Sequence, residues 1–379
     1  MKCIKNANIY IENYGVKNTS VSFNDRICNV GVASGDEIPL PNGAVVVAGF
    51  IDEHIHGAGG SDFMDGSVGT LKTISETLVK EGTVAFLATT VSASVEKTRN
   101  ALRSVGDFFN SENKSGAEIL GVHLEGPFIS KKFKGAMNEQ RIIPPDSVLL
   151  DEFVKDSGNR VKIVTYAPES DPEFVFLNAL LKRGIVPSMG HTDATVEIIG
   201  RAVKNGLKNV THTYNAMSPL HHREIGAVGS ALLFDDLNCE LIADELHVSV
   251  PAIELFLKCK PKDKIILITD SMRAKGVADG ISEIGEQKVI VKGIEARLEN
   301  GTLAGSVLKM NVAIRNLVKD LNVPFTDAVD FATINPAKVL GVDNDYGGIS
   351  VGKKASFTVL DNDFNVVMTI VNGEIVYKG

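Results

Sequence analysis

The sequence predicts an α/β fold: a (β/α)₈ barrel that carries a small β-sandwich built from both chain ends. Three observations indicate it. Both ends of the chain alternate apolar and polar residues with Gly and Asn breaks, as antiparallel strands do. Between them, apolar strand-like runs alternate with amphipathic segments, the pattern of a parallel sheet built from βαβ units. Polar side chains come directly after most of these runs, and the active site of such a barrel lies at the carboxyl ends of its strands.

The chain ends are expected to pair into one domain. Ile9, Ile11, Val21 and Phe23 lie in the alternating pattern near the start. Near the end, residues 356–360 and 366–376 read as strands, and the second contains an Asn372-Gly373 hairpin signal. A few strands from either end alone would be marginal. We therefore predict a β-sandwich domain of residues 1–44 with 348–379, and a barrel domain of residues 45–347.

The middle of the chain contains eight candidate barrel strands. They are residues 45–50, 83–88, 119–123, 161–165, 185–188, 209–211, 239–243 and 264–268. Amphipathic helices are predicted at 71–79, 95–109, 171–181, 196–207 and 252–258. Residues 276–305 are expected to form hairpins inserted after the eighth strand, and residues 307–341 return to helix. A TIM-type barrel fits this order, and an open doubly wound sheet is the alternative because sequence alone does not show closure.

Composition excludes several classes of protein. The chain has 379 residues, of which 44% are hydrophobic and 23% charged, which is ordinary globular usage. Its 39 Lys and Arg against 47 Asp and Glu give a net charge of −8 with no basic run, so a small-molecule substrate is favoured over nucleic acid. No apolar run approaches the ~18 residues of a membrane span.

The cellular location is predicted from the chain start and the cysteines. The N-terminal residues are interrupted by Lys and Asn, unlike a signal peptide. The four cysteines lie far apart, with no C-x-x-C pair. We expect reduced thiols in a cytoplasmic protein.

Histidines concentrate at the predicted strand ends. His54 and His56 follow the first strand, and their i, i+2 spacing places both imidazoles on one side. Glu125, His191 and His212 follow the third, fifth and sixth strands. An isolated His-x-His is a common chance motif, but five such residues at equivalent positions predict a divalent metal site. Mixed nitrogen and oxygen donors favour Zn²⁺, with Fe²⁺, Co²⁺ or Mn²⁺ as alternatives.

Asp270 follows the eighth strand, where an Asp is most often a helix cap or turn residue. Beside a metal-activated water, the same carboxylate could accept the proton of that water and pass it to a leaving amine. We therefore predict Asp270 as the general acid/base.

Two loops carry weaker signals. The loop after the sixth strand reads first as a polar surface loop, but its His222 and Arg223 also suit a phosphate. Gly305 and Ser306 look first like a helix N-cap.

Taken together, the motifs resemble those of the N-acetylglucosamine-6-phosphate deacetylase family of the amidohydrolase superfamily. The match runs nearly end to end. Its motifs, in chain order, are Gly49-Phe50-Ile51-Asp52 with His54-x-His56-Gly57, His123-Leu124-Glu125-Gly126-Pro127-Phe128, Gly190-His191-Thr192-Asp193-Ala194, Thr211-His212-Thr213-Tyr214-Asn215-Ala216-Met217, His222-Arg223-Glu224, Thr269-Asp270, Thr302-Leu303-Ala304-Gly305-Ser306, Asn335-Pro336-Ala337 and Val371-Asn372-Gly373. The resemblance implies a homodimeric metalloenzyme that hydrolyses N-acetylglucosamine 6-phosphate to glucosamine 6-phosphate and acetate.

The resemblance also implies roles for residues. Glu125, His191 and His212 match the ligands of the main metal, and His54 with His56 makes a second ion bridged through Glu125 plausible. Asp270 matches the catalytic acid/base. The matches to substrate-binding positions, some of which reach across the dimer, are Ala136, Met137, Asn215, Ala216, Arg223, His247, Leu303, Ala304, Gly305 and Ser306.

Two positions depart from the family pattern, and three rival functions stay open. Met137 stands where the family usually has a His that contacts the sugar, and Glu245 stands where it has a Gly. A related N-acyl amino sugar phosphate is therefore an alternative substrate. Another rival is a cyclic-amide hydrolase or deaminase with Lys162 as a bridging ligand. The third is a non-catalytic sugar-phosphate binder.

Overall fold

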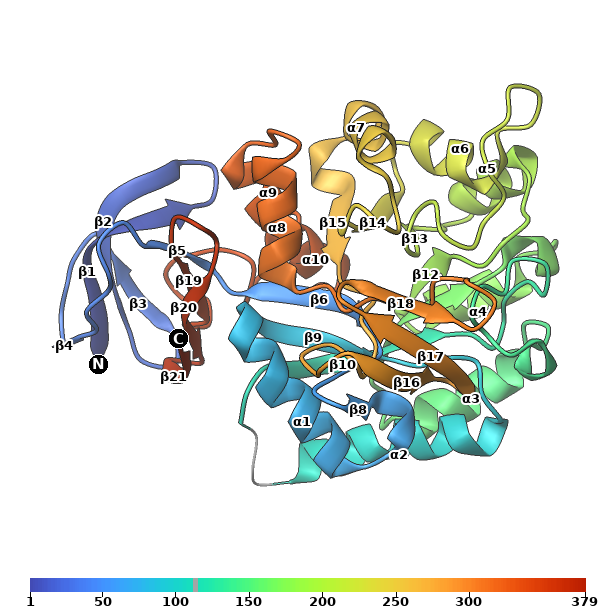
Figure 1. Cartoon of the computed structure of the whole chain (residues 1–379), viewed down its shortest axis with the longest axis horizontal. Coiled ribbons are helices and arrows are strands. Elements are labelled where there is room, and N and C mark those ends of the chain that lie inside the picture. The colour runs from blue at the N-terminus through green and yellow to red at the C-terminus, as the bar shows by residue number, and fades with distance from the viewer. Residues whose placement is uncertain (112–114) are drawn as a thin grey trace.

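An eight-stranded parallel sheet forms the larger part of the molecule (Figure 1). The computed structural model describes residues 1–111 and 115–379. The strands lie in chain order around the sheet: β6 (Phe50–Ile55), β9 (Thr83–Thr89), β10 (Glu118–Glu125), β11 (Val161–Tyr166), β12 (Val186–Met189), β13 (Asn209–Val210), β14 (Asn238–Ile242) and β15 (Ile265–Ile268). Each lies within one or two residues of a predicted strand, except the first.

The sheet closes into a barrel between its first and last strands. Just beyond β15, the amide of Asp270 donates to the carbonyl of His54 at 2.9 Å. The neighbouring Thr269 donates its hydroxyl to the carboxylate of Asp52, which is fully buried in β6. The barrel is therefore confirmed over the open-sheet alternative.

Helices cover the outside of the barrel (Figure 1). They are α1 (Val68–Leu78), α2 (Val95–Asn110), α3 (Ser147–Asp156), α4 (Val175–Lys182), α5 (Val196–Lys204), α6 (Gly226–Leu233), α7 (Val250–Cys259), α8 (Met310–Lys319), α9 (Phe325–Asp330) and α10 (Ile334–Val339). Short 3₁₀ turns are η1 (Phe63–Asp65), η2 (Val79–Glu81), η3 (Glu139–Arg141), η4 (Pro168–Ser170) and η5 (Lys262–Lys264). Neither α3 nor α6 was predicted from the sequence. All but the last residue of α6 are buried, so it has no polar face to give a helical period.

The two chain ends form a second sheet at one side of the barrel, and both termini lie in it (Figure 1). Its strand order is β21 (Glu374–Lys378), β20 (Val366–Val371), β19 (Phe357–Leu360), β5 (Val45–Ala48), β1 (Lys2–Ile11), β2 (Gly15–Phe23) and β3 (Ile27–Val30), and β4 (Asp36–Glu37) pairs with β1. Phe23 and Phe357 meet edge to face in its core, 5.1 Å between ring centres. The pairing of the chain ends is confirmed.

The predicted strand at residues 45–50 is wrong in one respect, because the chain changes sheets within it. β5 pairs with β1 and β19 in the chain-end sheet, whereas β6 belongs to the barrel. A Cβ at Gly49, between them, would lie 2.2 Å from a methyl carbon of Val84. The chain therefore changes sheets at Gly49, within the predicted strand, while the domain limits, 1–44 with 348–379 and 45–347, stay predictions.

A three-stranded antiparallel sheet is inserted after β15, as the sequence predicts for residues 276–305. Its strands are β16 (Gly280–Ile284), β17 (Gln287–Lys292) and β18 (Glu295–Leu298). A small hairpin of β7 (Gly57–Ala58) and β8 (Ser61–Asp62) comes after β6. Within the described residues, no helix combines the length and apolar character needed to cross a bilayer.

Candidate metal centre and substrate cavity

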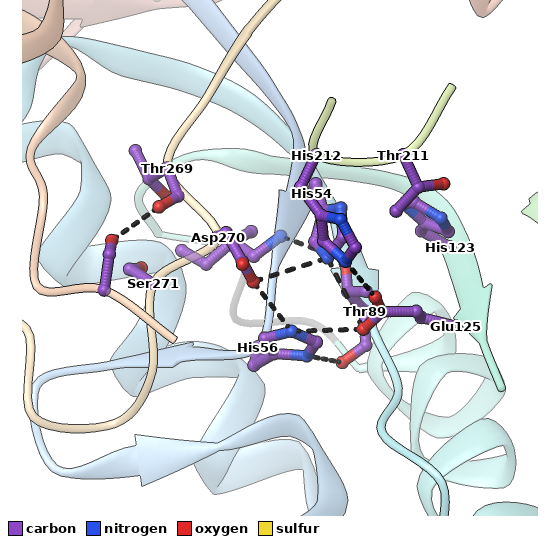
Figure 2. Close-up of polar contacts among 12 residues, drawn as sticks. His54, His56, Thr89, His123, Glu125, Thr211, His212, Thr269, Asp270 and Ser271 are labelled. Carbon is purple, nitrogen blue, oxygen red and sulfur yellow. Dashed lines mark hydrogen bonds and ion pairs between the residues drawn. The ribbon is translucent and has the colours of Figure 1, made fainter. Parts of the chain in front are cut away.

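Glu125, at the end of β10, lies at the centre of four imidazoles in the barrel mouth. Its Oε1 is 3.0 Å from Nε2 of His191 and 2.8 Å from Nε2 of His212. Its Oε2 is 3.4 Å from Nε2 of His56 and 3.6 Å from Nε2 of His54. Figure 2 shows three of these imidazoles turned toward the carboxylate. Two ligand groups, His54–His56–Glu125 and Glu125–His191–His212, thus share one carboxylate, as a two-ion centre requires.

The backbone bends sharply where these side chains leave the strands. His191 has φ 47°, His212 has φ 29° and Asp270 has φ 48°. Non-glycine residues rarely adopt this left-handed region, and each such residue costs on the order of 1–3 kcal/mol. The bends aim all three side chains into the barrel mouth.

Hydrogen bonds on the far side of the rings orient two of the imidazoles. Nδ1 of His56 lies 3.2 Å from the carbonyl of Thr89, and Nδ1 of His191 lies 2.8 Å from the carbonyl of Phe133. Because a carbonyl only accepts, Nδ1 is the donor and Nε2 keeps a lone pair for a ligand bond. Nε2 of His54 is buried without a hydrogen-bond partner in the described part of the chain. An ion between these nitrogens and Glu125 would satisfy it.

The charges of the site also fit a cation. Burial raises the pKa of Glu125, but His54, His191 and His212 outweigh it and hold that pKa well below its usual value. Burial likewise opposes ionisation of Asp270, yet His54 and His56 lower its pKa to about 2. Conversely, burial lowers the pKa of His54, but the surrounding carboxylates raise it well above normal. Imidazole protons thus compensate the ionised carboxylates, and a divalent cation would take over that role.

Asp270 lies against the first ligand group. Its Oδ1 is 3.0 Å from Nε2 of His56 and 3.5 Å from Nε2 of His54 (Figure 2). The carboxylate also lines the open side of the centre, facing a cavity. A proton acceptor is therefore placed between the candidate ions and the space for a substrate.

The cavity above the centre has a volume of about 350 Å³. Seven of the predicted substrate-binding residues line it: Ala136, Met137, Asn215, Ala216, His247, Leu303 and Gly305. Asp244 holds His247 in place by accepting from its Nδ1 at 2.6 Å and from its backbone amide at 2.8 Å.

Three further predicted substrate residues are not among those lining the cavity. Ala304 is buried, and its amide donates to the carbonyl of Ala296. Ser306 is also buried, and its amide donates to the carbonyl of Asp270 at 2.8 Å, so it holds the Asp270 segment. Arg223 is exposed, with Nη1 2.8 Å from Nε2 of His222. Their assignment as substrate ligands stays a prediction.

The structure shows where Met137 and Glu245, the two residues that depart from the family pattern, lie. Met137 is buried in the cavity wall, where its sulfur accepts from the amide of Ser92 at 3.2 Å. Glu245 has φ 64°, a conformation that favours glycine, and its side chain is exposed. Glu245 is not among the residues that line the cavity.

Three residues of the site, Arg297, Glu286 and Glu240, were not singled out from the sequence. Arg297 of β18 and Glu286 come from the inserted sheet, and both line the cavity. Among the described residues that line the cavity, Arg297 is the one whose side chain stays positively charged at any physiological pH, because the other basic side chains there are imidazoles. No pattern in the sequence indicates that the inserted sheet folds back over the mouth of the barrel. Glu240 lies beneath the ligands in β14, where a charge within an apolar run was the available signal.

Comparisons with known proteins agree with this geometry. The profile of the Amidohydrolase family matches residues 45–376. The N-acetylglucosamine-6-phosphate deacetylase of Bacillus subtilis (strain 168) is 43% identical, over 99% of this chain and 96% of that protein. The N-acetylgalactosamine-6-phosphate deacetylase of Escherichia coli O157:H7 is 32% identical, over 92% of this chain and 93% of its own length.

Solved structures agree as well. The N-acetylglucosamine-6-phosphate deacetylase of Thermotoga maritima superposes with a TM-score of 0.90 at 39% identity, covering 100% of both chains. An aspartate-to-alanine variant of the Mycobacterium smegmatis enzyme, solved with N-acetyl-D-glucosamine-6-phosphate, superposes with a TM-score of 0.92 at 26% identity. It covers 100% of this chain and 99% of the other.

Proposed function

The chain belongs to the amidohydrolase family, and we propose that within it the protein is a metal-dependent deacetylase of N-acetylglucosamine 6-phosphate. The observation that carries this proposal is Asp270 beside His56, which also faces the shared carboxylate of Glu125, in the lining of a cavity of about 350 Å³. The relatives that cover nearly the whole chain support the substrate.

The reaction adds water to the acetamide and releases acetate and an amine. Glu125 and the four imidazoles would hold a divalent cation, which would supply Lewis-acid stabilisation of the charge that develops on the acyl oxygen. Asp270 accepts a proton from the attacking water and returns it to the amine nitrogen as the C–N bond breaks. The cavity walls position the sugar over this carboxylate.

Metal analysis combined with a product assay tests the proposal. Purified protein is analysed for elements and assayed for glucosamine 6-phosphate release, before and after treatment with a chelator and after readdition of Zn²⁺, Fe²⁺, Co²⁺ or Mn²⁺. We expect one or two ions per chain and activity that depends on the ion. Metal-replete protein that releases no glucosamine 6-phosphate would overturn the substrate assignment.

The E. coli relative named for N-acetylgalactosamine 6-phosphate makes that epimer the second candidate substrate. Comparing kcat/KM for the two epimers, with unphosphorylated N-acetylglucosamine as a third substrate, separates the candidates. The rival with a bridging lysine has no such support, because Lys162 lies near the start of β11 while the ligands stand at the opposite ends of their strands. Turnover of any of these substrates would also exclude a non-catalytic binder.

The protein is further proposed to act as a homodimer that completes each substrate site across its interface. Arg223 supports this, because it is exposed and is not among the residues that line the cavity of its own chain. Mixing inactive Arg223→Ala and Asp270→Asn chains tests it. Hybrid dimers recover activity at one site if Arg223 acts on the partner subunit, whereas no recovery would contradict sharing.

Zinc as the native ion and a cytoplasmic location complete the proposal. The nitrogen and oxygen donor set supports Zn²⁺. The four cysteines are free thiols, which supports a reducing compartment. Metal content of protein made without added metal, and fractionation of the native cells, test these two points.

A further inference from the structure

A buried carboxylate, Glu240 of β14, lies directly below the metal ligands. Its neighbours along the strand, Cys239, Leu241 and Ile242, are buried apolar residues, and Glu240 itself is fully buried. Placing an ionised carboxylate inside a barrel costs several kcal/mol unless polar partners compensate for lost water. Its contacts therefore indicate what it does there.

One oxygen of Glu240 contacts both ligand groups. Oε2 lies 2.8 Å from Nδ1 of His54, which belongs to the His54–His56–Glu125 group. The same Oε2 accepts from the backbone amide of His212 at 3.0 Å, and His212 belongs to the Glu125–His191–His212 group. The contact to His54 leaves its Nε2 free to face Glu125 and Asp270.

The contact to His54 fixes the tautomer of an imidazole, and the contact to His212 fixes a backbone conformation. With Nδ1 donating to the carboxylate, His54 is held in the tautomer whose Nε2 has a lone pair. The bond to His212 holds a residue whose φ of 29° is unfavourable for any side chain. That backbone conformation sets where the His212 imidazole meets Glu125.

The neighbouring His123 does not make this cluster an ion site of its own. His54, His123 and Glu240 do lie within reach of one point. However, Nδ1 of His123 is 3.1 Å from the carbonyl of Glu53, and its Nε2 is 2.7 Å from the hydroxyl of Thr165. Both of its nitrogens are thus engaged by protein oxygens, and only two candidate ligands remain.

We propose that Glu240 is a positioning residue of the metal centre, which orients one imidazole of each ligand group through a single carboxylate oxygen. The inference rests on the proposed metal-dependent function. Glu240 acts through His54 and His212 and is not one of the residues that line the cavity. Its loss therefore weakens ion binding and kcat while leaving KM for the sugar nearly unchanged.

Metal affinity of the Glu240→Gln and Glu240→Leu variants tests this inference. The amide keeps the shape but loses the charge and the fixed acceptor, so we expect ion affinity to fall about 10-fold, and about 100-fold in the leucine variant. Chelator competition and elemental analysis measure this. The visible spectrum of Co²⁺-loaded protein reports the changed ligand geometry independently of activity.

Glu53→Gln is the matched control, because Glu53 is equally buried in β6, beside His54 in the chain, and its side chain accepts a hydrogen bond from Asn209 rather than from a candidate ligand. Metal-free melting temperatures of all variants separate loss of fold from loss of ions. Unchanged ion affinity and Co²⁺ spectrum in Glu240→Gln, or an equal loss in Glu53→Gln, would overturn the inference. Wild-type protein that binds no ion would instead refute the proposed function.

Discussion

The metal centre and the rim of the substrate cavity are built in different ways. The predicted ligands of the centre meet at Glu125, because each lies at or just beyond the end of a strand of the same barrel. The rim is formed by loops and an inserted sheet. Arg297 lines the cavity there, whereas the predicted residues Arg223, Ala304 and Ser306 are not among the lining residues. The barrel strands therefore position the candidate ligands, whereas the rim of the cavity is formed by segments outside those strands.

Asp270→Asn gives the largest expected effect, at the centre. The amide cannot accept a proton from water, so kcat should fall by about 10³-fold, within the range of general acid–base catalysis. Steady-state kinetics measure the loss, and elemental analysis verifies that the ions remain. Activity near that of the wild type would remove Asp270 from the mechanism.

Arg297→Gln tests the rim. The guanidinium of Arg297 is the permanent cation of the described cavity lining, so its loss should raise KM for a phosphorylated sugar about 10-fold, or about 1.4 kcal/mol, with kcat little changed. Arg141→Gln is the control, because Arg141 pairs with Glu286 at 3.3 Å without lining the cavity. A KM increase as large for the unphosphorylated sugar would contradict a contact with phosphate.

Met137→His asks whether the rim tolerates the residue typical of the family. An imidazole adds a hydrogen-bond donor to the cavity wall, and we expect KM to fall by about threefold. Met137→Leu, which conserves volume, should leave KM unchanged within about twofold. Equal KM values in the two variants would show that the donor does not reach the sugar.

Glu245→Gly gives the smallest expected effect and compares strain in the two regions. Glycine removes the cost of the left-handed φ of 64°, so the free energy of unfolding should rise by up to about 1 kcal/mol without a change in activity. Glu245→Ala removes the same side chain but keeps the strain, and should not be stabilised. The corresponding change at His191 or His212, with φ 47° and 29°, should cost the metal, because glycine there removes a candidate imidazole ligand along with the strain.

The centre was far more predictable from the sequence than the rim. His54, His56, Glu125, His191, His212 and Asp270 were all found from their positions at or just beyond predicted strand ends, and the structure brings them together. That reasoning works because parallel strands of a barrel end at one mouth.

The residues of the rim could not be predicted from strand-end positions in the same way. Arg297 lies in β18, where the alternation of side chains predicts which residues share its face of the strand. The same alternation does not predict that the inserted sheet covers the barrel mouth. The change of sheets at Gly49 was also missed, because β5 and the first two residues of β6 form one apolar run. Apolar residues indicate that a strand is buried, and strands of both sheets are buried, so apolar character does not show where one sheet ends and the other begins.

The barrel, the pairing of the chain ends and the candidate ion ligands could all be predicted from the sequence, because hydrophobic periodicity and strand-end position are local properties. Three relations required the folded molecule: Glu240 joins His54 to His212, Arg297 lines the cavity, and Glu245 does not. Those relations depend on distances between residues far apart in the chain, and hydrogen bonds and charge interactions act only across the few ångströms that folding creates.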